Sequence, residues 1–124
     1  MIDAYGAGLD LDFSNLVAAD FRAANELSAP TDAAPKIARI EERMVSGAAG
    51  QIPARFYYPL GEGPFPMTLY FHGGGFVIGS PAMTDGICQT LAARAQSLVI
   101  SPDYRLAPEA PFPKGLEDCR EVLR

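Results

Sequence analysis

The sequence predicts an α/β protein whose sheet is mostly parallel and carries an antiparallel hairpin at one edge. Three observations lead to this expectation. An apolar run at Met67–Phe71, a helical pattern over Ala82–Ser97 and a short apolar run at Leu98–Ser101 follow one another in the order of a parallel strand–helix–strand unit. Upstream, two strand-like segments are joined by the glycine-bounded turn Gly47–Gly50. The length of 124 residues and the hydrophobic content of 48% suit one domain with a buried core.

The N-terminal segment is expected to contain an amphipathic helix over Asp12–Leu27. Its apolar residues recur at helical spacing, at Phe13, Leu16, Val17, Phe21, Ala24 and Leu27. Pro30 and Pro35 then predict a turn-forming linker that ends at Lys36. Residues 1–36 are therefore one predicted unit, and residues 37–124 are the α/β core.

The core is predicted to begin with two strands, Ile37–Ser46 and Ile52–Tyr58, which pair as an antiparallel hairpin at the sheet edge. The charged run Glu41-Glu42-Arg43 in the first strand is interpreted as a solvated face. After a loop rich in glycine and proline, the run Met67–Phe71 is apolar apart from one threonine, as expected of a buried strand.

Two helices are expected farther along the chain, each with one apolar face. In the helix over Ala82–Ser97 this face consists of Ile87, Leu91 and Ala95, widened by Cys88 and Ala92. The second helix begins at Lys114, and its face consists of Leu116, Cys119 and Leu123. The two cysteines are interpreted as buried free thiols, because neither belongs to a C-x-x-C pair.

Charge and composition argue against several classes of function. The net charge is −5 and the cationic residues are scattered, so nucleic acid and anionic membrane surfaces are poor partners. With His72 as the only histidine, no metal site or cofactor is predicted. No apolar run approaches the roughly 20 residues of a membrane helix, and Met1–Tyr5 lacks the basic start of a signal peptide. A cytoplasmic protein is therefore expected.

Three consecutive glycines, Gly73–Gly75, follow the apolar strand and His72. Each glycine costs about 0.5–1 kcal/mol relative to alanine in ordered structure, so the run implies a need for bare backbone. A tight turn would need only one or two glycines, whereas a nest of N–H donors would bind an anion. Two phosphate-binding motifs do not fit. Ile78 replaces the third glycine of the dinucleotide pattern, and Ser80-Pro81 stand where a phosphate loop requires Lys followed by Ser or Thr.

Two motifs now point to one family. His72–Phe76, together with Tyr104–Glu109 and Pro111–Pro113, resembles the HGGGF and YRLAPE…PFP motifs of the bacterial hormone-sensitive lipase family of carboxylesterases. This resemblance implies an α/β-hydrolase fold, of which the chain would be the N-terminal part, since such folds run to about 250 residues. It also implies that the N-terminal helix covers the active site; a helix packed on the core is the alternative. Ala107-Pro108 and Phe112-Pro113 become candidates for cis peptide bonds.

The resemblance assigns roles to the glycine loop. Gly73 and Gly74 would donate N–H groups to an oxyanion hole, Gly75 would continue their loop, and His72 would support it. The residues expected to hold the following loop near this site are Asp103, Tyr104, Arg105 and Glu109. No serine of the sequence lies in a G-x-S-x-G elbow, so the nucleophile is absent, and so are its acid and base.

The leading hypothesis is a serine carboxylesterase for short or medium acyl esters, to which this chain contributes the oxyanion loop without the catalytic triad. The 124-residue chain alone is predicted to be inactive. One alternative is a non-catalytic truncated hydrolase that binds acyl ligands or a protein partner. Another is a deacylase for carbohydrate esters or lactones. An unpaired edge after the last strand is also expected to promote self-association.

Overall fold

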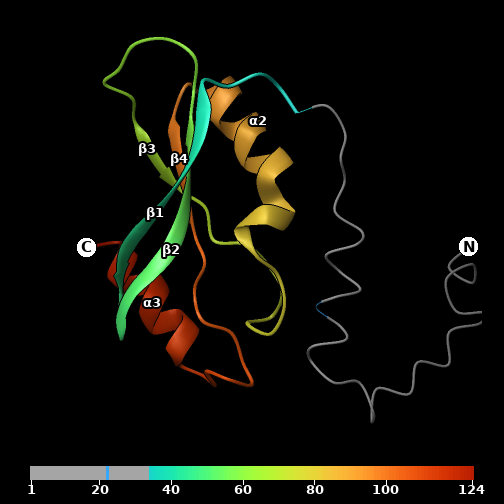
Figure 1. Ribbon diagram of the computed structural model, residues 1–124, viewed down its shortest axis with the longest axis vertical. Helices are drawn as coiled ribbons and strands as arrows, with labels where there is room; N and C mark the ends of the chain where they lie inside the picture. Colours follow the sequence, from blue (N-terminus) through green and yellow to red (C-terminus); the bar gives the residue numbers. More distant parts are fainter. Residues whose placement is uncertain (1–21, 23–33) are drawn as a thin grey trace, which may run out of the picture.

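The computed structural model describes Arg22 and residues 34–124. The helix expected over residues 12–27, apart from Arg22, and most of the linker after it lie outside the described residues. The described elements, shown in Figure 1, are β1 (Arg39–Gly47), β2 (Gly50–Tyr58), β3 (Met67–Leu69), the short 3₁₀ helix η2 (Pro81–Thr84), α2 (Asp85–Ala95), β4 (Leu98–Pro102) and α3 (Lys114–Val122).

The first two strands form the expected antiparallel hairpin. Their register runs from Arg39 opposite Tyr58 to Gly47 opposite Gly50, where the turn reverses the chain. Gly50 has a φ of +135°, a conformation that side-chain-bearing residues rarely adopt. β1 is mostly exposed, which confirms the solvated face predicted for its charged run.

The sheet has the order β1-β2-β4-β3. β3 and β4 are parallel and are joined through α2, which confirms the strand–helix–strand unit. The described part of the sheet is nevertheless mixed rather than mostly parallel, because β2 runs antiparallel to both of its neighbours.

β3 lies at the edge of the sheet next to β4. Met67 is 73% exposed, so the expectation of a buried strand over Met67–Phe71 is wrong for the described residues. β4 is the buried strand, because it has a partner on each side. In the described part of the sheet, the last strand of the sequence is therefore interior, and the two edge strands are β1 and β3.

The core lies between the sheet and α2. Tyr57 and Val99 face one another across β2 and β4, and both are fully buried with Cys88 and Ala92 of α2. The next residue, Ile100, points to the other face of the sheet, where it lines a groove with the end of α3. The two helices thus cover opposite faces (Figure 1).

The buried face of α2 includes only part of the predicted one. Cys88 and Ala92 are completely buried, whereas Ile87 is 51% and Leu91 36% exposed. Small side chains allow α2 to approach the Tyr57 ring and the sheet closely, which places the larger side chains outside.

The buried face of α3 was also predicted wrongly. Gly115 and Asp118 are buried, whereas Leu116 is 41% and Leu123 63% exposed. Cys119, expected to be buried, is half-buried, and both cysteines are free thiols. The orientation of α3 follows from the hydrogen bonds of the Asp118 carboxylate, described below.

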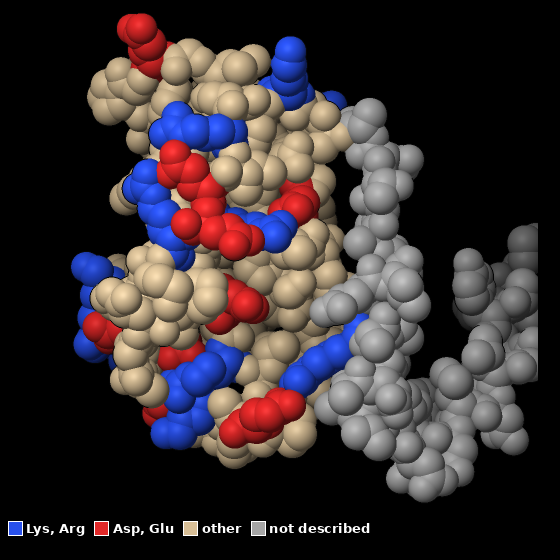
Figure 2. Space-filling model, in the orientation of Figure 1, with Lys and Arg blue, Asp and Glu red and all other residues tan. Residues whose placement is uncertain are grey.

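In the region the structure describes, no helix is both long and apolar enough to cross a bilayer. Basic and acidic side chains are interspersed on the face shown in Figure 2.

Candidate functional site

His72 opens the glycine loop just beyond the end of β3. The residue is 3% exposed, and its ring stacks on the ring of Tyr104 with centroids 4.3 Å apart and an interplanar angle of 11°. The Tyr104 hydroxyl donates a hydrogen bond to the His72 carbonyl, and His72 Nδ1 lies 2.9 Å from the carbonyl oxygen of Gly73. Burial raises the pKa of Tyr104 to about 12, so its hydroxyl remains a donor at neutral pH. His72 is therefore a buried brace for the loop.

The next part of the loop depends on glycine for steric reasons. Gly74 has a φ of +132°, and its carbonyl accepts hydrogen bonds from the amides of Val77 (3.1 Å) and Ile78 (3.0 Å). A Cβ atom on Gly74 would overlap the carbonyl oxygen of Ile78. Gly75 and Phe76 follow with φ near +60°, and in a phenylalanine this conformation costs about 1–3 kcal/mol. The fold itself thus explains Gly74 and Gly75.

Gly79 closes the same loop. Its φ is +99°, and a Cβ atom there would overlap the Gly73 carbonyl oxygen and lie 2.5 Å from His72 Nδ1. Gly73 is different. Its φ is not positive, and a Cβ atom there would meet nothing within 4 Å. The fold does not require glycine at position 73.

A pocket of about 280 Å³ lies over this loop and is lined by His72, Gly73, Gly74, Ile78, Gly79, Ser80, Met83 and Thr84. No acceptor among the described residues takes the amide hydrogens of Gly73 and Gly74. Neighbouring backbone N–H groups without an acceptor form a site for an anion or a developing oxyanion. The apolar side chains of Ile78 and Met83 suit a hydrocarbon group beside it.

The four residues predicted to support the site occupy different places. Tyr104 contacts His72 directly, and the Asp103 amide donates to the Pro53 carbonyl at 2.8 Å, which anchors the start of the loop to β2. Arg105 pairs with Asp118, and Glu109 pairs with Arg22. The peptide bonds Ala107-Pro108 and Phe112-Pro113 are cis, as expected.

Asp118 is a structural residue that the sequence analysis missed. Its fully buried carboxylate accepts hydrogen bonds from Arg105 Nε (2.7 Å), Arg105 Nη2 (2.8 Å), the Arg105 amide (3.2 Å) and the Ala48 amide (2.9 Å). Burial by itself raises the pKa of this carboxyl, but the hydrogen bonds from Arg105 and Ala48 outweigh burial and hold it below its usual value. One side chain thus joins α3, the hairpin turn and the loop after β4. The sequence signal that could have identified it is an acidic residue adjacent to Cys119 and three residues after Gly115 on a predicted helix.

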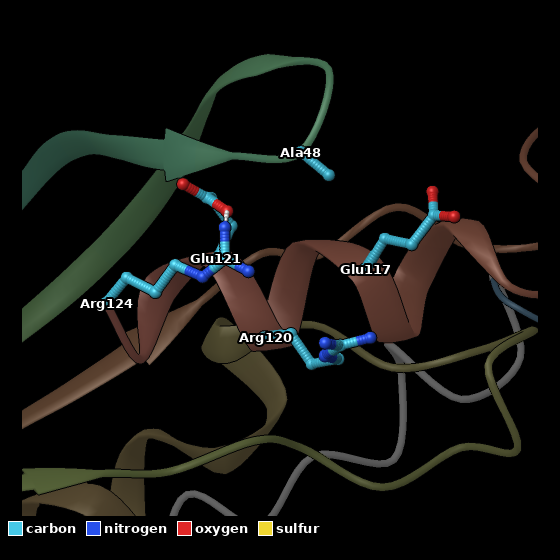
Figure 3. A pocket seen from close by; sticks show the side chains of 5 residues that line it. All are labelled: Ala48, Glu117, Arg120, Glu121 and Arg124. Atoms are coloured by element: carbon cyan, nitrogen blue, oxygen red, sulfur yellow. Dashed lines mark hydrogen bonds and ion pairs between the residues drawn. The ribbon is translucent and has the colours of Figure 1, made fainter.

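A second hollow lies between the hairpin turn and α3 (Figure 3). It is lined by Ala48, Glu117, Arg120, Glu121 and Arg124. Arg124 and Glu121 pair with one another at 3.1 Å, and the lining carries both signs of charge. Elsewhere in the described ranges, no three His, Cys, Asp or Glu side chains are arranged to hold a metal ion. The pocket over the glycine loop is therefore the candidate site.

Comparison with known proteins identifies relatives that are named as esterases. A family described as alpha/beta hydrolase fold matches residues 68–124. The esterase LipI of Mycobacterium tuberculosis is 45% identical over 89 residues, which are 69% of this chain and 28% of that protein. The carboxylesterase NlhH of the same species is 40% identical over 101 residues, which are 80% of this chain and 31% of that protein. The chain thus spans about a third of the length of these relatives.

Solved structures agree with the sequence relatives. The thermostable carboxylesterase EstE1, cloned from a metagenomic library, superimposes with a TM-score of 0.82 at 36% identity, covering 87% of this chain and 38% of that one. An esterase of Pyrobaculum calidifontis superimposes with a TM-score of 0.81 at 37% identity, covering 86% of this chain and 36% of that one. The predicted fold class and the predicted family resemblance are both confirmed.

Proposed function

Because this chain belongs to the α/β hydrolases, in the bacterial hormone-sensitive lipase family of carboxylesterases, we propose that the protein hydrolyses esters of short or medium acyl chains. The reaction would use a serine nucleophile. We assign the oxyanion-hole loop to this chain. We assign the nucleophile, the acid and the base to none of its residues. A cytoplasmic location is part of the same proposal.

The observation that carries the proposal is the contrast between Gly73 and its neighbours. Gly74, Gly75 and Gly79 have positive φ, and a Cβ atom on Gly74 or Gly79 would overlap the loop. Gly73 has neither constraint, is exposed and lines the pocket. A glycine that the fold does not need is explained by a ligand that must approach the backbone closely.

The proposed chemistry follows from those donors. When a serine oxygen attacks an ester carbonyl, negative charge develops on the carbonyl oxygen, and the N–H groups of Gly73 and Gly74 would donate to it. One such donor is worth about 2.7–4 kcal/mol of transition-state stabilisation. A third donor comes, in this fold, from the residue after the nucleophile. His72, held by Tyr104, would keep the two glycine amides aimed at one point.

The proposal is tested with p-nitrophenyl acyl esters. The 124-residue chain is expected to show no turnover, whereas the protein purified from its own cells is expected to hydrolyse the esters. Its intact mass is measured in the same preparation. A mass of 13.2 kDa without turnover would refute the esterase assignment and favour the non-catalytic binding module. Turnover by the 124 residues alone would refute the absence of a nucleophile.

A further inference from the structure

Arg22 binds two loops that the sequence places far from it. Its Nε donates to the carbonyl of Val77 at 2.8 Å, and its Nη2 donates to the carbonyl of Ala107 at 2.6 Å. The same guanidinium forms a bidentate pair with Glu109, with both N–O distances 2.9 Å. One side chain therefore contacts the glycine loop and the loop after β4 at the same time.

The carbonyls of Val77 and Ala107 lie next to the hydrogen bonds that hold the glycine loop in place. Val77 follows Phe76, whose φ is +60°, and the Val77 amide donates to the Gly74 carbonyl. The Ala107 amide donates to the Phe76 carbonyl at 2.7 Å, which joins the two loops through the backbone. Arg22 adds a second bridge beside this bond. The backbone at Phe76 and Val77 is thus joined to the loop after β4 by two neighbouring bridges.

The geometry requires arginine. A guanidinium presents a planar set of donors that can bind a carboxylate with two N–H groups and still donate Nε to a carbonyl, which the single ammonium of lysine cannot do. The Arg22 side chain is 25% exposed, whereas that of Glu109 is 66% exposed. Solvent screens the ion pair, so the two carbonyl contacts carry most of the bridging, and Glu109 orients the guanidinium.

We propose that Arg22 is a positioning residue of the oxyanion loop, acting through the Val77 and Ala107 carbonyls to hold the amides of Gly73 and Gly74 in place. The catalytic half of this inference rests on the proposed esterase function. The structural half does not, because the loop and its hydrogen bonds are present in the chain itself.

The structural half is tested by amide hydrogen exchange on the full chain. In Arg22→Ala and Arg22→Lys, the amides of Val77, Ile78 and Ala107 are expected to exchange about tenfold faster than in the unaltered chain. Glu109→Gln keeps both carbonyl contacts and is expected to change exchange less. The control is Arg43→Ala, which removes a guanidinium paired with Glu41 on β1, and it should leave these amides unchanged. Equal exchange in Arg22→Lys and the unaltered chain would overturn the inference.

The catalytic half is tested in the ester-hydrolysing protein. Arg22→Ala is expected to lower kcat about tenfold or more with KM changed less than about twofold, because the loop donates mainly in the transition state. Added guanidinium ion should restore part of the kcat of Arg22→Ala, and it should leave the kcat of Arg43→Ala unchanged. An unchanged kcat in Arg22→Ala would overturn the positioning role. If the unaltered protein hydrolyses no ester while exchange responds as expected, the proposed function fails and the loop bridge stands.

Discussion

Replacing Gly74 by alanine should disrupt the glycine loop. The added Cβ would overlap the Ile78 carbonyl oxygen, and alanine rarely adopts a φ of +132°. Forcing that conformation costs about 1–3 kcal/mol. Moving Ile78 away would break the hydrogen bonds from the Val77 and Ile78 amides to the Gly74 carbonyl, each worth about 1 kcal/mol. The native loop should lose about 3–5 kcal/mol, the sum of these effects.

Gly73→Ala is the matched control, one residue away. Its φ suits alanine and its Cβ would meet no atom within 4 Å, so the free energy of unfolding should change by less than about 0.5 kcal/mol. The new methyl group would nevertheless stand in the pocket. If a substrate approaches this backbone, Gly73→Ala should lower kcat/KM for ester hydrolysis while leaving the fold intact.

The assay combines urea unfolding with hydrogen exchange at Val77 and Ile78. Because the loop lies at the end of β3, Gly74→Ala is expected to free both amides for exchange and to lower the unfolding midpoint. Gly73→Ala should resemble the unaltered chain in both measurements. Equal midpoints and equal protection in the two variants would refute the steric argument. Undiminished ester hydrolysis by Gly73→Ala in the active protein would refute the placement of substrate against Gly73.

Four further outcomes are expected. Asp118→Asn should lower the free energy of unfolding in urea by about 3 kcal/mol, because it removes the buried negative charge that pairs with Arg105. A change below about 1 kcal/mol would contradict this. The pKa of the Asp118 carboxyl is lowered in the folded state, so its stabilisation is present above the usual pKa of 3.8 and is lost as pH falls below that value. Asp118→Asn should therefore flatten the loss of stability in acid, and parallel acid curves would argue against the carboxylate as the cause. Gly86→Ala in α2 should raise the free energy of unfolding by about 0.5–1 kcal/mol, because its Cβ would meet nothing within 4 Å, and a loss of stability would count against that packing. Burial raises the pKa of both cysteine thiols, and in iodoacetamide labelling followed by mass spectrometry the half-buried Cys119 should react before the buried Cys88; the reverse order would contradict their burial.

The features that could be predicted from the sequence are those that short-range chemistry controls. The hairpin around Gly47–Gly50 and the unit that joins β3 to β4 were predicted because turn residues and apolar periodicity lie within a few residues of one another. The HGGG loop was recognised for the same reason, since His72 and its glycines are consecutive. The family was predicted from the resemblance of two short motifs, His72–Phe76 and Tyr104–Glu109, to those of known carboxylesterases.

The choice of helix face could not be predicted, because it depends on what each helix packs against. Ile87 and Leu91 fit an apolar stripe as well as Cys88 and Ala92 do, and only the bulk of Tyr57 on the sheet favours the smaller pair. The position of β3 at the edge of the sheet likewise follows from strand order, about which a local apolar pattern carries no information.

The amino-acid sequence by itself determined the elements, their order and the glycine loop, because each depends on neighbours along the chain. Only the tertiary structure decided which groups that are far apart in the sequence come into contact. Arg22 reaches Glu109 over 87 residues and Asp118 reaches the amide of Ala48 over 70, and no local pattern encodes such pairs. The structure also separated Gly74, which the backbone requires, from Gly73, which it does not, because that distinction depends on φ and on the atoms that surround each glycine in space.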